Sequence, residues 1–178
     1  MAVVWRIELL GSLRLVGDHG TLEHFQTRKT EELLALLALP PITRKTREQL
    51  IETLWPEIDP ATGRNRLSQA LAWLRARLEP EGVLPESVLQ ADRRTVGLNP
   101  QAIESDIAVL EELLSGPVTE ETLALYTADL LPELDAEWLA WRREQLRERF
   151  TEATRQWVRQ LEPAQAEPLL RRALEFEP

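Results

Sequence analysis

The chain has 178 residues, 43% of them hydrophobic and 29% charged, with a formal net charge of −9 at pH 7. This length allows one large or two small domains with real cores. Cysteine is absent, which excludes disulfide bonds and cysteine-based metal sites. No run of about 20 apolar residues occurs, and the N-terminal apolar run is too short for a signal peptide, so we expect a cytoplasmic protein.

The charge is unevenly distributed along the chain. Residues 1–99 contain 13 Lys and Arg and 13 Asp and Glu, whereas residues 100–178 contain 8 and 17. The whole excess of acid therefore lies in the second part. A net-acidic protein is ordinarily a poor nucleic-acid binder, because long-range repulsion slows its encounter with phosphates. The cations of the first part are clustered, and a Debye length of about 8 Å at physiological salt lets such clusters outweigh distant charge.

The first elements are short strands. Residues 5–9 and 13–16 alternate apolar and polar side chains at a period of two, with Gly11-Ser12 between them. This pattern predicts two antiparallel strands joined by a turn. A third strand over residues 21–25 is an open alternative.

Two helices are expected next. Thr27 is placed to cap a helix over residues 28–39, which ends at a Pro-Pro pair. Thr46 then precedes a short apolar-periodic segment, and Gln49 stands three residues later. This spacing is typical of a capping box, so we expect a short helix that stops before Pro56.

The segment from Asp59 to Pro80 is the most informative part of the chain. It predicts one helix with two faces, because apolar residues recur at helical spacing. The predicted buried stripe consists of Leu67, Ala70, Leu71, Leu74 and Leu78. The opposite face holds Asn65, Gln69, Ala72, Trp73 and Ala76, flanked by Arg66, Ser68, Arg75 and Arg77. Residues 60–78 contain four arginines and no acidic residue. We therefore expect this helix to bind an anionic partner.

A small hairpin is expected after this helix. Residues 87–90 and 95–98 are strand-like, and the four residues between them include Arg93 and Arg94. Everything beyond Asn99-Pro100 is expected to be helical. The predicted helices cover about 103–114, 119–126, 136–161 and 164–175, with Asp135 as the N-cap of the third. The last of them is similar to the closing helix of a tetratricopeptide hairpin.

The ordered motifs resemble a known family. Phe25-Gln26-Thr27-Arg28-Lys29, Leu54-Trp55-Pro56 and Leu74-Arg75-Ala76-Arg77-Leu78 are similar to the OmpR-type winged helix-turn-helix of antibiotic regulatory proteins of the SARP/AfsR type. Ser105-Asp106-Ile107, residues 126–132, and Glu137-Trp138 with residues 142–146 resemble the bacterial transcriptional activator domain that follows in that family. The resemblance covers nearly the whole chain.

The resemblance implies a fold and a domain organisation. The fold is an α+β N-terminal winged helix-turn-helix followed by an all-α tetratricopeptide-like helical domain. The implied domains are a DNA-binding domain over residues 1–99 and an activator domain over residues 100–178. Two alternatives stay open for the second domain, because one such helical unit cannot bury its face alone. The chain is then either the front of a longer repeat array or a protein that dimerises.

The resemblance also implies a function and its residues. The protein is expected to be a transcriptional regulator that binds double-stranded promoter DNA, and contacts RNA polymerase or a second copy of itself. The groove-facing positions are Asn65, Ser68, Gln69, Ala72, Trp73 and Arg75. Phosphate contacts are expected from Arg64, Arg66, Arg77, Arg93, Arg94, Lys45 and Thr46, with Arg28 as a further DNA-contacting position. Gln69 is the best base reader, since an amide can donate and accept on adenine.

Other functions have less support. A protein-interaction module whose winged helix does not read DNA is the competing hypothesis, motivated by the net acidity and by Ala72-Trp73, where basic residues are common in this family. His19 and His24 are isolated, so no metal is expected. No phosphate-binding loop, nucleophile elbow or HExxH motif occurs, so we expect neither an enzyme nor a cofactor.

Overall fold

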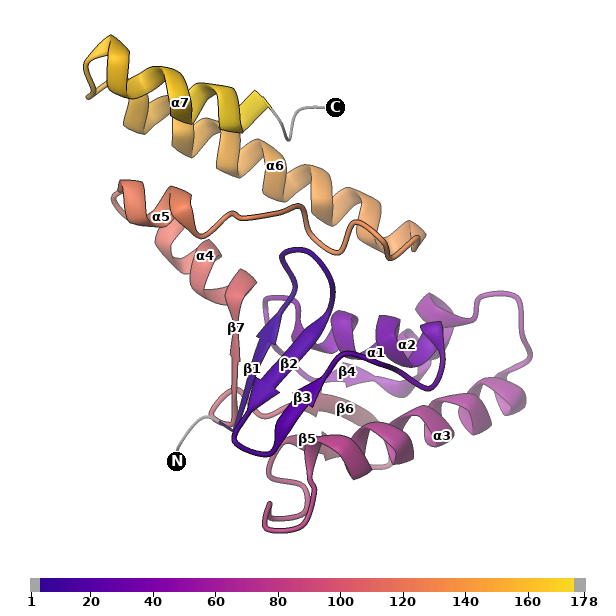
Figure 1. Ribbon diagram of the computed structural model, residues 1–178. Helices are drawn as coiled ribbons and strands as arrows, with labels where there is room; N and C mark the ends of the chain where they lie inside the picture. Colours follow the sequence, from indigo (N-terminus) through magenta and orange to yellow (C-terminus); the bar gives the residue numbers. More distant parts are fainter. Residues whose placement is uncertain (1–3, 175–178) are drawn as a thin grey trace. The chain divides into compact units, whose positions relative to one another are not determined.

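The computed structural model describes residues 4–174 and divides the chain into two compact units (Figure 1). The first unit consists of the chain up to Leu9 together with Leu13–Ser105. The second consists of Leu10–Ser12 and the chain from Asp106 onward. The first unit mixes strands and helices, and the part of the second unit that the structure describes is mainly helical.

A four-stranded sheet opens the first unit. Its strands are β1 (Trp5–Glu8), β2 (Arg14–Gly17), β3 (Gly20–Leu22) and β7 (Ile103–Ser105), in the order β3-β2-β1-β7. The expected antiparallel pair β1–β2 is confirmed. The third strand is also present. It covers Gly20–Leu22, so it starts one residue earlier than expected and ends before residue 25.

Strand β7 corrects the expectation of a helix from residue 103. It pairs in parallel with β1, so that Ile103 lies opposite Trp5 and Ser105 opposite Ile7. Ile103 and Ser105 are buried while Glu104 between them is exposed, which is the period-two pattern of a strand. Three residues are too few to reveal this period in the sequence, and the partner strand is remote along the chain.

The first unit also contains three helices. They are α1 (Arg28–Ala38), α2 (Arg47–Leu54) and α3 (Pro60–Leu78). The predicted caps are confirmed: the Thr27 hydroxyl accepts from the amide of Thr30, and Thr46 and Gln49 form a capping box. The Asp59 carboxylate accepts from the first free amides of α3. Each helix therefore begins where its cap satisfies amides that have no partner inside the helix.

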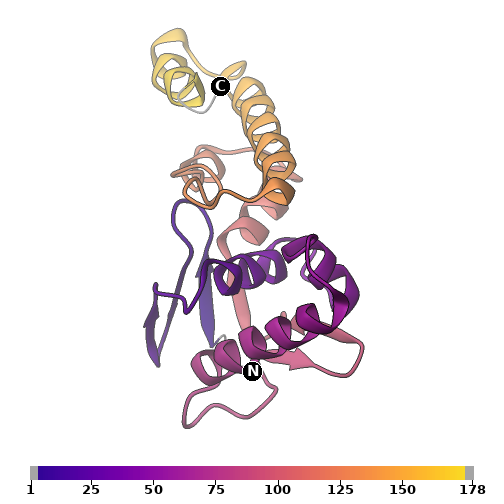
Figure 2. The same cartoon turned by 90° about the vertical axis from the view of Figure 1, so that its right-hand side faces the viewer.

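A three-stranded sheet follows α3. It consists of β4 (Lys45–Thr46), β5 (Leu89–Ala91) and β6 (Thr95–Leu98), in the order β4-β6-β5. The expected hairpin is present as the antiparallel pair β5–β6. Strand β4 was not expected; it pairs with β6 and so connects the start of α2 to the hairpin. Figure 2 shows the hairpin and α3 in the same unit from a second side.

The core of the first unit is built largely from one face of each helix. The predicted stripe of α3 is confirmed, since Leu67, Ala70, Leu71, Leu74 and Leu78 are all buried. Apolar side chains of α1, α2 and the sheets are buried as well, among them Leu33, Leu37, Leu50, Leu54, Ile7, Leu15, Leu89 and Val96. Burial of one face of α3 leaves its other face available.

The second unit contains α4 (Asp106–Leu114), α5 (Glu120–Ala124), α6 (Glu137–Val158) and α7 (Pro163–Leu174). The expected end of α7 at residue 175 lies outside the described residues. The expected N-cap of α6 was wrong. Ala136, not Asp135, occupies that position, and no side chain caps the helix. Arg143 donates to the carbonyls of Leu130, Leu131 and Leu134 in the loop before α6. Asp135 ends this loop one residue before the N-cap position.

The core of the second unit centres on an aromatic pair. The rings of Tyr126 and Phe150 stack with 4.3 Å between their centroids, and both side chains are fully buried. Asp129 accepts from Arg147 beside them, and its carbonyl accepts from the amide of Gly11 at 2.8 Å. Among the described residues, no helix has the length and apolar character needed to cross a membrane.

Candidate nucleic-acid interface

Helix α3 presents a continuous polar face opposite its buried stripe. Its exposed side chains include Arg64, Asn65, Arg66, Ser68, Gln69, Ala72, Ala76 and Arg77. No carboxylate lies on α3 itself. The face therefore combines guanidinium groups with amide and hydroxyl groups, which are the groups that bind phosphates and base edges.

Trp73 does not project freely from this face. It is half-buried, its ring centroid lies 6.0 Å from that of Phe25, and the two planes are tilted by 49°. The guanidinium carbon of Arg77 lies 5.4 Å from the Trp73 ring centroid, within cation–π range. Trp73 thus connects α3 to the segment before α1, and Arg77 is held along the helix surface.

Arg75 supports the hairpin. Its Nη2 donates to the carbonyl oxygen of Leu89 at 3.2 Å. Its guanidinium also lies 3.6 Å from the carboxylate of Glu79 and 3.9 Å from that of Glu86. These contacts engage Arg75 inside the first unit, so its charge is partly compensated there.

The tip of the β5–β6 hairpin is ordered by one carboxylate. Asp92 accepts from the backbone amides of Thr95 at 2.8 Å and Arg94 at 2.7 Å. It also pairs with Arg44 at 2.7 Å. The backbone hydrogen bonds, first that of Thr95, lower the pKa of Asp92 from 3.8 to about 2. The side chains of Arg93 and Arg94 are exposed at this tip.

The remaining predicted site residues lie around the start of α1 and α2. Thr46 is half-buried, and its hydroxyl accepts from the amide of Gln49 at 3.1 Å as the cap of α2. Lys45 precedes it in β4 and is half-exposed, and Arg28 is exposed at the first position of α1. The structure thus brings the start of α2 and the hairpin tip together through the β4–β6 pairing.

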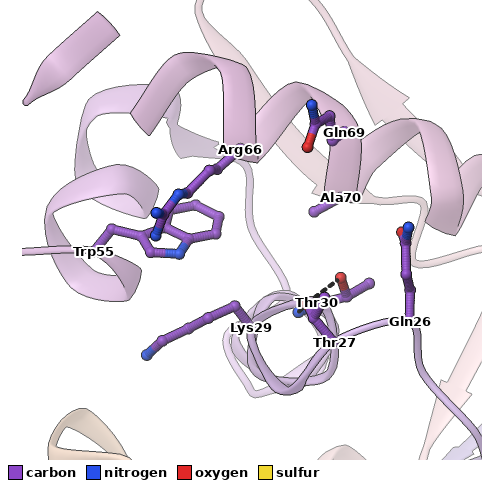
Figure 3. Close-up of a pocket in the computed structure, with 8 residues that line it drawn as sticks. All are labelled: Gln26, Thr27, Lys29, Thr30, Trp55, Arg66, Gln69 and Ala70. Atoms are coloured by element: carbon purple, nitrogen blue, oxygen red, sulfur yellow. Dashed lines mark hydrogen bonds between the residues drawn. The ribbon is translucent and has the colours of Figure 1, made fainter. Parts of the chain in front are cut away.

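A groove lies between α1, the end of α2 and α3. Its volume is about 350 Å³. It is lined by Gln26, Thr27, Lys29, Thr30, Trp55, Arg66, Gln69 and Ala70 (Figure 3). Sequence reasoning assigned no groove here, and it missed Gln26 and Lys29 as lining residues. The side chain of Trp55 is only 8% exposed. Nothing local in the sequence reveals the groove, because its walls come from three separate elements.

The structure gives no candidate metal centre in the part of the chain that it describes, since no three His, Asp or Glu side chains converge there. The site is therefore defined by cations, amides and hydroxyls on the outer face of α3, at the hairpin tip and in the groove. Together with the architecture, this defines a mixed α/β unit with a cationic helix, followed in sequence by a helical unit.

This architecture is shared with a solved structure, Mycobacterium tuberculosis EmbR in complex with a low affinity phosphopeptide. The TM-score is 0.70 at 22% sequence identity, and the match covers 84% of this chain and 43% of the EmbR chain. At this identity the likeness establishes the fold alone. The chain spans less than half the length of the solved EmbR chain that it matches. No protein-family model and no curated protein sequence matches this chain.

Proposed function

We propose that the protein is a DNA-binding transcriptional regulator that reads promoter DNA with helix α3. One observation carries the proposal: the outer face of α3 exposes arginines, amides and a hydroxyl with no carboxylate, in a chain of net charge −9. Such a face suits the phosphates and base edges of a duplex. The fold shared with EmbR and the ordered sequence motifs support the same class of protein.

In the proposed mechanism α3 enters the major groove and the β5–β6 hairpin acts as the wing. Gln69 reads an adenine through paired hydrogen bonds, with Asn65 and Ser68 beside it. Arg64, Arg66, Arg93, Arg94, Lys45 and Arg28 contact phosphates and fix the orientation without reading sequence. Trp73 and Arg75 keep α3 and the hairpin in place, because their contacts lie inside the first unit.

The proposal extends to the second unit. The first unit, which extends to Ser105, is the proposed DNA-binding domain, and the part from Asp106 onward is the proposed tetratricopeptide-like activator domain that contacts RNA polymerase or a second copy. Trp141 on α6 is 68% exposed, and large exposed aromatic side chains are frequent at protein interfaces. The protein acts in the cytoplasm under this proposal, where promoter DNA is present.

The first test is a titration of the full chain with random-sequence duplex DNA over a range of salt concentrations. Binding through several phosphate contacts predicts a log–log slope of about −0.9 for each contact. Arg94→Gln removes one exposed cation from the hairpin tip, so the slope should become shallower by about one contact. Absence of binding to random duplex even at low salt contradicts the proposal. It favours the competing adaptor function, which the exposed side chain of Trp141 also supports.

The second test addresses sequence reading. Gln69→Ala should weaken binding to a selected duplex by about 1–3 kcal/mol more than binding to random duplex. Arg94→Gln is the matched control, since loss of a phosphate contact should weaken both complexes alike. Equal weakening of both duplexes by Gln69→Ala removes Gln69 as a base reader while leaving the DNA-binding proposal in place.

A further inference from the structure

The groove beside α3 has the size of a small-molecule site. Its volume is about 350 Å³, whereas a water molecule in the liquid occupies about 30 Å³. A single phosphate or sulfate group is therefore far too small to fill it. The volume falls at the lower end of the range of about 300–1,000 Å³ that is typical of pockets for organic ligands.

The lining of the groove selects an anion. Two of its residues are cationic, Arg66 and Lys29, and none is acidic. The ammonium of Lys29 is paired with the carboxylate of Glu32 at 2.7 Å. For the guanidinium of Arg66, in contrast, the described residues supply neither a hydrogen bond nor an ion pair. A ligand carboxylate or phosphate on Arg66 gains a charge-assisted hydrogen bond, which is among the stronger polar contacts.

The arrangement of the side chains also favours a flat ring. Figure 3 shows Arg66 extending from α3 towards the indole of Trp55, with Lys29 on the same side of the groove. Gln69 and Gln26 lie on the other side. Trp55 is 8% exposed, so a ligand ring meets only the part of the indole that reaches the groove wall. A ring at this position brings its acidic group to Arg66 and leaves polar substituents for the two amides. Six of the eight lining residues are polar, and Trp55 and Ala70 supply the apolar part of the wall.

We propose that this groove binds a small organic anion, with an aromatic ring against Trp55 and an acidic group on Arg66, and that the ligand competes with DNA. The competition rests on the proposed function, because it requires that the exposed Arg66 and Gln69 serve both the ligand and the duplex. The site itself does not depend on DNA binding. Ligand binding is therefore measured first without DNA.

The experiment titrates the full chain with a panel of one- and two-ring aromatic carboxylates that includes 2-naphthoate, by calorimetry and amide chemical shifts. We expect saturable binding with one site per chain, shifts at residues of the groove, and about tenfold or greater weakening when 2-naphthamide replaces 2-naphthoate. Failure of every panel member to saturate overturns the proposal. Equal binding of the neutral amide overturns it as well, because the site then does not select an anion.

Variants test the position of the site. Arg66→Gln should weaken 2-naphthoate binding about tenfold or more, since it removes the guanidinium partner. Gln26→Glu places a carboxylate in the lining from an exposed loop position and should weaken binding by repulsion. Arg64→Gln is the matched control, because Arg64 is exposed on the same helix but is not among the lining residues. Loss of binding in this control overturns the placement in the groove.

The last arm adds duplex DNA. We expect the apparent dissociation constant for DNA to rise linearly with the 2-naphthoate concentration, and the slope should be smaller in Gln26→Glu. Ligand binding that leaves DNA affinity unchanged overturns the competition. A chain that binds 2-naphthoate but no DNA under any salt condition contradicts the proposed function and not the ligand site, so the two failures are distinguishable.

Discussion

At the scale of single residues, the carboxylate of Glu79 binds several backbone amides beside the candidate site. Glu79 follows α3 directly, and its side chain is only 2% exposed. Its Oε1 accepts from the amides of Val88 at 3.0 Å and Leu89 at 2.9 Å, and Oε2 accepts from that of Glu86 at 2.9 Å. One carboxylate thus attaches the hairpin to the end of the cationic helix.

Glu79→Ala should therefore destabilise the first unit by about 2–4 kcal/mol, because three backbone amides lose a charged acceptor. Glu79→Gln keeps one acceptor oxygen and should cost less. Native-state hydrogen exchange at the core amides of α3 and β5 measures both changes. A change below about 0.5 kcal/mol in Glu79→Ala contradicts the assigned role.

The lowered pKa of Asp92 leads us to expect that order at the hairpin tip depends on pH. Its pKa is lowered from 3.8 to about 2, chiefly by hydrogen bonds from the amides of Thr95 and Arg94. A carboxylate with a lowered folded pKa contributes stability that is fully present above its unfolded pKa. This contribution is lost as the pH falls through the folded value. Order at the tip should therefore decline between about pH 4 and pH 2.

The carboxyl carbon shift of Asp92, followed by NMR, should titrate with a midpoint near 2. The amide of Thr95 should move over the same interval, since it donates to the same carboxylate. Asp92→Asn serves as the control and should abolish this titration. A midpoint near the ordinary value of 3.8 contradicts the hydrogen-bonded tip.

At the scale of elements, the crossing of α2 and α3 depends on Gly63. A Cβ at this position would lie 2.4 Å from Cγ2 of Ile51, and this branched side chain cannot move away easily because Ile51 is 8% exposed. Gly63→Ala should destabilise the first unit by about 1–3 kcal/mol despite the better helix propensity of alanine. Hydrogen exchange of the α2 amides measures the loss.

The control for this prediction is Gly116→Ala, where the nearest atom lies at an ordinary 3.7 Å. We expect a change within about 0.5 kcal/mol there. Ile51→Leu lacks the γ2 methyl group, so it should restore part of the stability when it is combined with Gly63→Ala. Lack of any such recovery indicates that the clash lies elsewhere.

The elements also show what could be predicted from sequence. The caps at Thr27 and Thr46 were predictable because each acts within three residues of its own position. The buried stripe of α3 was predictable because its period is local. Strands β4 and β7 were not, since two or three residues carry no clear period and their partners are remote in the sequence.

The same distinction holds for the candidate site. Exposure of Gln69, Asn65 and Arg66 followed from helical periodicity alone. The engagement of Arg75 with the hairpin could not be foreseen, because its partner Leu89 depends on how the chain returns after α3. The groove is a property of three elements packed together, so no local pattern in the sequence contains it.

At the scale of the whole molecule, the charge distribution opposes the proposed function at long range and supports it at short range. The acidic excess lies in residues 100–178, while the exposed face of α3 carries arginines without acids. Association with DNA is governed by the field of the whole protein, whereas dissociation depends on the contacts of the bound complex. Acidic residues in the second unit should therefore lower the association rate with DNA and leave the dissociation rate unchanged.

The triple variant Glu148→Gln, Glu152→Gln and Glu162→Gln tests this at three exposed positions and removes three negative charges. We expect the association rate with duplex DNA to rise about twofold or more at low salt, with an unchanged dissociation rate, in stopped-flow measurements. The gain should shrink as the Debye length falls from about 30 Å at 0.01 M to about 8 Å at 0.15 M salt. Gln156→Ala with Gln160→Ala is the uncharged control on the same part of the chain. A slower dissociation in the triple variant contradicts the argument, because it means that these glutamates lie close to the bound duplex and act by direct repulsion.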